Sequence, residues 1–252
     1  MNKIYFVTGS QDLYGEETLA QVAKDSTQMA DFLNEKLSDI AEVVFQPVVK
    51  TADEAEDICV RASSDKECIG VIMWMHTFSP AKMWIRALKA LKKPMLHLHT
   101  QFNEKLPYDS IDMDFMNLNQ SAHGDREFGF ICTRLGIKRE VVAGYYQHDD
   151  VTEKIRRFAH AASAVSFSRT LRVAMLGNNM RDVAVTDGDR VESEIRFGWN
   201  VNYYGIGDVA EIADGVTESE IDAKMAEYTE KYAMATDNIA AVREHFVITE
   251  GI

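Results

Sequence analysis

Short apolar runs alternate with longer amphipathic stretches along residues 1–164, and this alternation constrains the fold more than any other feature. Residues 69–75, Ile-Gly-Val-Ile-Met-Trp-Met, form a continuous apolar run typical of a strand buried on both faces. Shorter runs of this kind predict strands at residues 3–7, 43–49, 95–99 and 141–145. Helical patterns between them predict helices at residues 16–37, 52–62, 80–91 and 151–164. Repeated strand–helix alternation gives parallel strands with crossover helices, so we expect an α/β fold with a doubly wound parallel sheet of the flavodoxin or Rossmann type.

A second domain is expected after a polar, irregular stretch at residues 163–170. The chain then resumes with an apolar run at residues 171–176, which predicts a new strand. We expect an N-terminal doubly wound domain at residues 1–170 and part of a central α/β domain at residues 171–252. One further strand near 201–204 and helices near 189–197 and 218–232 are too few to complete a doubly wound sheet. The second domain therefore looks truncated, with no obvious structure at its C-terminal end.

Charge and cysteine content exclude several classes of protein. The formal net charge of the 252 residues is −13 and no basic run interrupts it, so we expect neither nucleic acid nor an anionic membrane as a partner. No apolar run approaches the roughly 20 residues of a membrane span. Cys59, Cys68 and Cys132 lack the spacing of a zinc site, and they predict reduced, buried thiols in a cytoplasmic protein.

The segment at residues 109–130 combines carboxylates, amides, methionines and one imidazole. If it is one helix, Asp112, Met116, Asn119 and His123 fall on a single stripe. Polar groups interleaved with methionine suggest a wall that binds a small polar molecule. A partly buried helix with its amides bonded internally is the alternative, and periodicity alone favours that alternative.

Ligands of doubly wound sheets bind beyond the carboxyl ends of the strands, and this rule selects the loops at residues 9–15, 75–80 and 99–102 and the loop before residue 109. Gln11 is expected to project over the strand ends, although a tight strand–helix loop explains the same residues. The loop has no Gly-Lys-Ser/Thr and no GxGxxG pattern, so nucleotide binding is weakly supported. Phe78 can seal a ligand site or belong to an interface. Met180 follows the strand at 171–176 and is expected to face an inter-domain cleft, or to lie in a long ordered loop.

Metal and acid–base chemistry find little support in the residues themselves. His97 and His99 share one face of a strand, but a metal site there would need carboxylates from Asp109, Asp112 or Asp114. No Ser-His-Asp, Cys-His or paired-glutamate arrangement can be identified from spacing. From the residues alone, the chain is a two-domain α/β protein with a polar cleft and an unassigned reaction.

Several of these motifs together resemble the L-arabinose isomerase family. The resemblance is carried by Gly-Ser-Gln-Asp-Leu-Tyr-Gly at 9–15, Trp-Met-His-Thr-Phe-Ser-Pro-Ala-Lys-Met-Trp at 74–84, His-Thr-Gln-Phe at 99–102, and residues 109–123, 126–130 and 179–189. It implies a cytoplasmic intramolecular oxidoreductase that converts L-arabinose to L-ribulose, and often D-galactose to D-tagatose. It also implies a divalent ion, usually Mn²⁺, and a homo-oligomer built from trimers.

The resemblance also divides the family's functional residues between this chain and sequence that it does not contain. Family members are about twice as long, and their metal ligands, including the glutamates that move the proton, lie beyond Ile252. We therefore expect no metal ligand and no catalytic residue here, and no isomerase activity from this chain alone. The family's substrate contacts match Gln11, Leu13, Phe78, Gln120, His123 and Met180, with Gln120 and His123 reaching into a neighbouring subunit's site. A non-catalytic sugar-binding or regulatory α/β module is the competing hypothesis.

Overall fold

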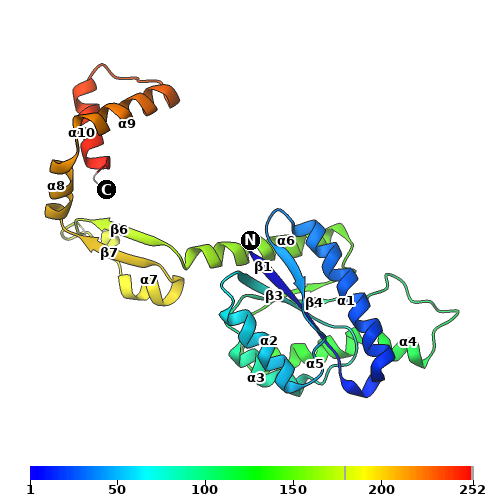
Figure 1. The fold of residues 1–252 in the computed structure, drawn as a ribbon. Helices are drawn as coiled ribbons and strands as arrows, with labels where there is room; N and C mark the ends of the chain where they lie inside the picture. The colour runs from blue at the N-terminus through cyan, green and yellow to red at the C-terminus, as the bar shows by residue number, and fades with distance from the viewer. Residues whose placement is uncertain (179, 251–252) are drawn as a thin grey trace. The chain divides into compact units, whose positions relative to one another are not determined.

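The computed structural model describes residues 1–178 and 180–250 (Figure 1), and its backbone divides into two units, Met1–Phe167 and Ser168–Ile252. The first unit is built on five parallel strands in the order β2-β1-β3-β4-β5. They are β1 (Lys3–Gly9), β2 (Glu42–Phe45), β3 (Cys68–Met75), β4 (Met95–His99) and β5 (Glu140–Ala143). The predicted doubly wound parallel sheet is confirmed.

Strand lengths follow the local chemistry of each run. All eight residues of β3 are buried, as expected for the central strand of a sheet covered on both faces. β2 ends at Phe45, earlier than predicted, because Pro47 has no N–H to donate to a neighbouring strand. Past this proline, only an isolated bridge joins Val49 to Gly9.

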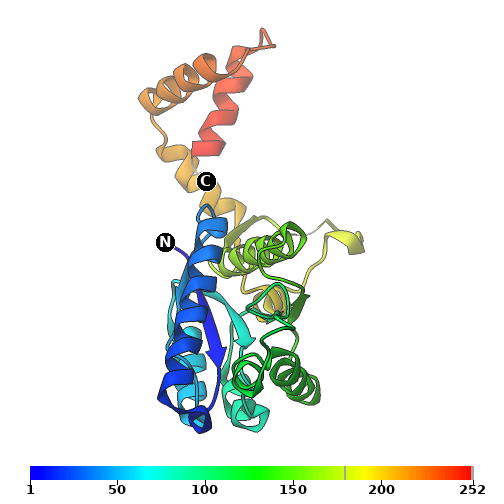
Figure 2. The same ribbon diagram turned by 90° about the vertical axis from the view of Figure 1, so that its right-hand side faces the viewer.

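Helices cover both faces of the sheet, and alternate residues of each strand point to opposite faces. In β3, Ile72 and Trp74 pack with one set of helices, while Val71 and Met73 pack with the other. The first set is α1 (Gly15–Leu37) and α6 (Asp149–Ser168), and the second is α2 (Ala52–Ser64), α3 (Trp84–Ala90) and α5 (Ser121–Arg134) (Figures 1 and 2). Two apolar cores therefore hold the sheet between helical layers.

The segment at residues 109–130 differs from the single helix considered above. It forms α4 (Met113–Leu118) and α5, separated by Asn119 and Gln120, whose backbones are not helical. Asp112 is the N-cap of α4, where its carboxylate accepts a hydrogen bond from Phe115 N at 2.8 Å. The helix is interrupted here because Gln120 N donates a hydrogen bond to the carbonyl of His76 at 3.1 Å, and His76 is far away in the sequence. The prediction that Asp112, Met116, Asn119 and His123 form a stripe on one helix is therefore wrong.

The second unit contains a two-stranded parallel sheet with helices. Its strands are β6 (Arg172–Leu176) and β7 (Asn200–Tyr204), and its helices are α7 (Arg190–Phe197), α8 (Ile206–Gly215), α9 (Glu218–Lys231) and α10 (Ile239–Glu250). The sequence predictions omitted α8 and α10. The expectation of no structure near the C-terminal end is wrong, because α10 packs against α9 through edge-on contact of Phe246 with Tyr228. None of the described helices is long and apolar enough to cross a bilayer.

Candidate functional site

The sheet order places β1 beside β3, and the helices that follow these two strands cover opposite faces. At such a switch point the connections diverge and leave a crevice beyond the carboxyl ends of the strands. The two strand-end loops are joined there by a hydrogen bond of 2.7 Å between the buried hydroxyls of Ser10 and Thr77. The loops at 9–15 and 75–80 therefore form one connected surface.

α5 lies closely against the loop after β3. A Cβ added to Gly124 would lie 2.6 Å from the carbonyl oxygen of Thr77, closer than side-chain carbons approach, so only glycine fits here. One residue earlier, the ring of His123 lies against the ring of Phe78, with centroids 4.5 Å apart. Phe78 and His123, both predicted to contact substrate, are thus in mutual contact.

Gln120 lies at the junction between α4 and α5, where its backbone is bonded to His76. Its side-chain amide donates to Asn117 Oδ1 at 3.4 Å. Gln120 and His123 line a hollow of about 340 Å³ whose other walls are mainly apolar, formed by Leu106, Ile111, Met113, Phe115, Met116 and Ala122, with Asn117 and Asn119. An imidazole and an amide at the edge of an apolar hollow are suited to orienting a small polar ligand.

Leu13 lines a second hollow, of about 550 Å³, on the other side of α4. The side chain of Leu13, on the short helix η1 (Asp12–Tyr14), is 84% exposed. Phe115 and Asn117 contribute to both hollows, so α4 is their shared wall. Gln11 is half-buried in extended backbone just before η1 and lines none of the hollows described here. Met180 belongs to the second unit, where it is 64% exposed.

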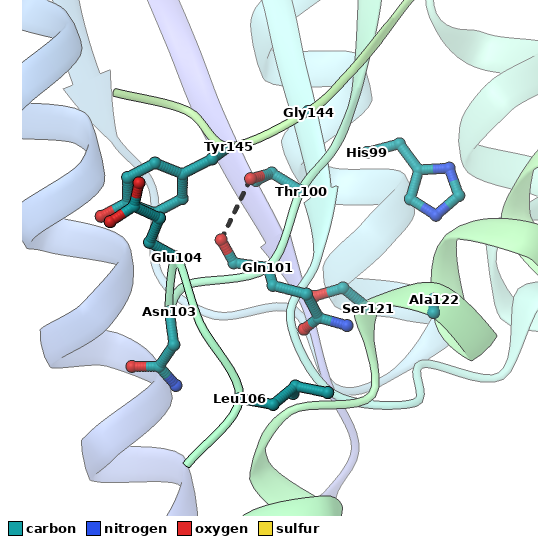
Figure 3. A pocket seen from close by; sticks show the side chains of 10 residues that line it. All are labelled: His99, Thr100, Gln101, Asn103, Glu104, Leu106, Ser121, Ala122, Gly144 and Tyr145. Carbon is teal, nitrogen blue, oxygen red and sulfur yellow. Dashed lines mark hydrogen bonds between the residues drawn. The ribbon is translucent and has the colours of Figure 1, made fainter. Parts of the chain in front are cut away.

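A third hollow, of about 370 Å³, lies at the carboxyl ends of β4 and β5 (Figure 3). Its walls come from the ends of both strands, from the loop after β4 and from the start of α5: His99, Thr100, Gln101, Asn103, Glu104, Leu106, Ser121, Ala122, Gly144 and Tyr145. Burial lowers the pKa of His99. Leu106 and Ala122 also line the hollow beside Gln120, so the two hollows are neighbours.

Two buried histidine–aspartate pairs lie behind these surfaces, and the sequence predictions missed both aspartates. His76 Nε2 lies 2.9 Å from Asp25 Oδ2, and His97 Nε2 lies 2.8 Å from Asp125 Oδ1. Asp25 occupies a core-facing position of α1 between Val22 and Met29, so a carboxylate on a mainly apolar stripe was the available signal. Burial raises the pKa of Asp125 well above its usual range and lowers the pKa of His97 to about 3. Each group of the second pair is thereby moved toward its neutral form.

The possible metal-binding pair, His97 and His99, has none of the additional carboxylate ligands considered above beside it. The rings of His97 and His99 are parallel with centroids 5.8 Å apart, and the carboxylate beside His97 is Asp125 rather than Asp109, Asp112 or Asp114. Within residues 1–178 and 180–250, no group of three or more His, Cys, Asp or Glu side chains is arranged to hold a metal ion. The residues described here therefore do not fit a manganese ion, which needs several such ligands at once.

Comparison with known families gives a match along almost the entire chain. Residues 1–170 match the L-arabinose isomerase N-terminal domain, and residues 172–251 match the L-arabinose isomerase central domain. Among individual proteins, the chain is 50% identical over 250 residues to the L-arabinose isomerase of Geobacillus stearothermophilus. It is 51% identical over 249 residues to that of Mycolicibacterium smegmatis strain ATCC 700084. Each alignment covers 99% of this chain and 50% of the relative, so the chain spans about half the length of these relatives.

Proposed function

Because the chain belongs to the L-arabinose isomerase family, we propose that it forms the substrate-lining half of an enzyme that converts L-arabinose to L-ribulose. The contact between Phe78 and His123, beside Gln120 at the carboxyl edge of the sheet, carries the proposal. An aromatic face, an imidazole and an amide offer one apolar surface and several hydrogen-bonding atoms to a ring or chain of hydroxyls. Leu13, Gln11 and Met180 complete the proposed set of substrate-lining residues.

Aldose–ketose isomerisation divides naturally between two sets of groups. Moving a proton between adjacent carbons requires a general base and an electrophile that polarises the two oxygens. We propose that Mn²⁺ and its ligands come from sequence outside this chain. Gln120 and His123 would bind and orient the sugar hydroxyls, while Phe78 and Leu13 would keep water from the reacting carbons. On this division the chain alone does not catalyse the reaction.

The remaining parts of the proposal follow from the family. We propose a trimer-based homo-oligomer in which Gln120 and His123 face the active site of a neighbouring copy. Exposed apolar side chains close to them, including Met113 and Met116, support an interface there. D-Galactose, converted to D-tagatose, is the proposed second substrate. A cytoplasmic location is supported by the buried, unpaired state of Cys59, Cys68 and Cys132, and we propose that the domain boundary lies near residue 170.

A fusion protein tests the proposed function. This chain would replace the corresponding half of the Geobacillus stearothermophilus enzyme, which is 50% identical to it over the aligned residues. We expect Mn²⁺-dependent formation of L-ribulose from L-arabinose by the fusion, and none by the 252-residue chain. A folded, manganese-binding fusion without turnover would contradict the function. Turnover by the chain alone, above a metal-free blank, would contradict the division of labour.

A non-catalytic sugar-binding or regulatory module is the second candidate. It is favoured by the complete five-stranded sheet and by the hollow beside Gln120, both contained in one unit of this chain. Calorimetry would separate the two candidates. Binding of L-arabinose to the chain alone, combined with an inactive but folded fusion, would favour the module.

A further inference from the structure

The carbonyl group of His76 is the point from which the proposed sugar-contacting wall is held. It accepts a hydrogen bond from Gln120 N at 3.1 Å and a second from the Ser121 hydroxyl at 3.3 Å. Both donors lie at the junction of α4 and α5, where the chain leaves helical geometry. The direction of this one carbonyl therefore sets where α5 begins, and with it the position of His123.

The side chain of His76 is fixed by contacts on two sides. It is fully buried, and its ring stacks on Trp74 with centroids 4.3 Å apart and planes 15° apart. Its Nε2 lies 2.9 Å from Asp25 Oδ2, and the other oxygen of Asp25 accepts a hydrogen bond from Gln21 at 2.7 Å. Gln21 in turn lines the hollow of Leu13. Hydrogen bonds thus run from the hollow of Leu13 to the ring of His76, and the backbone carbonyl of the same residue bonds to the wall of the other hollow.

A simpler purpose, stabilising the core, does not explain this arrangement well. Taking a carboxylate out of water is costly, and apolar residues of the same volume often stabilise a core as well or better. Asp25 is only 3% exposed and lies on α1 between the buried apolar residues Val22 and Met29, next to buried Ser26. What the carboxylate adds is direction, because it restricts the imidazole to one orientation and so limits rotation of the His76 peptide.

We propose that Asp25 and His76 are positioning residues, which hold Gln120 and His123 in the orientation that the sugar requires. The link runs from Asp25 on α1, through the ring and carbonyl of His76 at the end of β3, to the first turn of α5. Neither residue lines the hollows beside Leu13 and Gln120. The inference rests on the proposed function only for the identity of the ligand, because the mechanical link can be measured without any sugar.

Hydrogen exchange of the 252-residue chain tests the link directly. In Asp25→Ala we expect the Gln120 amide, which donates to His76, to exchange at least tenfold faster, with a smaller increase in Asp25→Asn. Amides of β1 should change little. Asp31→Asn, the same change at an exposed position of α1, serves as the matched control and should leave Gln120 unaffected. Equal acceleration at β1 and Gln120 would show a general structural role and overturn the proposal, as would unchanged exchange at Gln120.

Kinetics of the fusion protein supply the second readout. Asp25→Asn should raise KM for L-arabinose severalfold and leave manganese affinity unchanged. An active fusion whose KM responds to His123→Ala but not to Asp25→Asn would overturn the positioning role while keeping the proposed function. If the fusion is inactive, the proposed function fails, and the exchange measurement still decides whether Asp25 controls the junction.

Discussion

Gly124→Ala probes how closely α5 must approach the loop after β3. In an exposed helix interior this change is stabilising by about 1 kcal/mol, because alanine is the better helix former. Here the new Cβ would lie 2.6 Å from the Thr77 carbonyl oxygen and 3.1 Å from Met75 Cβ. The nearest neighbour is backbone, so α5 must move away by most of an ångström. Overpacking of this kind costs about 1–3 kcal/mol, and a clash with backbone belongs to the upper part of that range, about 2–3 kcal/mol. After the gain of about 1 kcal/mol from alanine, we expect a net loss of about 1–2 kcal/mol.

Gly129→Ala is the matched control, because it makes the same change in the same helix. The nearest atom to its new Cβ is a terminal nitrogen of Arg139 at 3.4 Å, which is ordinary contact with a flexible side chain. Here we expect a gain of up to about 1 kcal/mol. The two substitutions should therefore change the free energy of unfolding in opposite directions.

Urea unfolding measures both variants. Trp74 and Trp84 are buried in the first unit and report its transition, while Trp199 of the second unit adds the same signal to every variant. The Gly124→Ala transition should shift to lower urea with an unchanged slope. If Gly124→Ala is as stable as the parent while Gly129→Ala behaves as expected, the close docking of α5 is wrong.

Two further predictions concern buried ionisable groups. Burial raises the pKa of Asp125, so the folded chain keeps a proton that the unfolded chain releases above pH 3.8. The free energy of unfolding therefore falls as pH rises, by at most about 1.4 kcal/mol per pH unit from this group. Asp125→Asn has no such proton, so its unfolding free energy should rise relative to that of the parent over the pH range above 3.8, while the titration of His97, whose folded pKa is about 3, is common to both chains. A constant difference across that range would show an ionised carboxylate. Burial raises the pKa of Cys59 to about 12 and that of Cys132 to about 11, so iodoacetamide should label neither thiol until denaturant is added. Rapid labelling in native buffer would contradict their burial.

Runs with a strong local pattern were predictable from the sequence. The apolar run at 69–75 corresponds to β3 (Cys68–Met75), and the predicted strand at 95–99 has the observed bounds of β4. Such strands are specified by their own residues, because burial on both faces requires apolar side chains throughout.

Features set by distant partners were not predictable. The helix break at Asn119 and Gln120 depends on the carbonyl of His76, which periodicity within 109–130 cannot reveal. Asp25 and Asp125 are buried because each finds a histidine, 51 and 28 residues away along the chain. Phe78 and His123 were proposed as substrate contacts from family resemblance, and their mutual contact emerged only from the fold. Their contact with a sugar stays a prediction.

We propose that this half of the enzyme contacts sugar and not metal. KM for L-arabinose and Mn²⁺ affinity, both measured in the fusion protein with and without His123→Ala, distinguish a sugar contact from a metal contact. Loss of one hydrogen bond to a sugar hydroxyl is worth about 1.4 kcal/mol, which is a tenfold increase in KM. We expect that increase with unchanged manganese affinity. A large loss of manganese affinity, or an unchanged KM, would show that His123 does not have the proposed sugar-binding role.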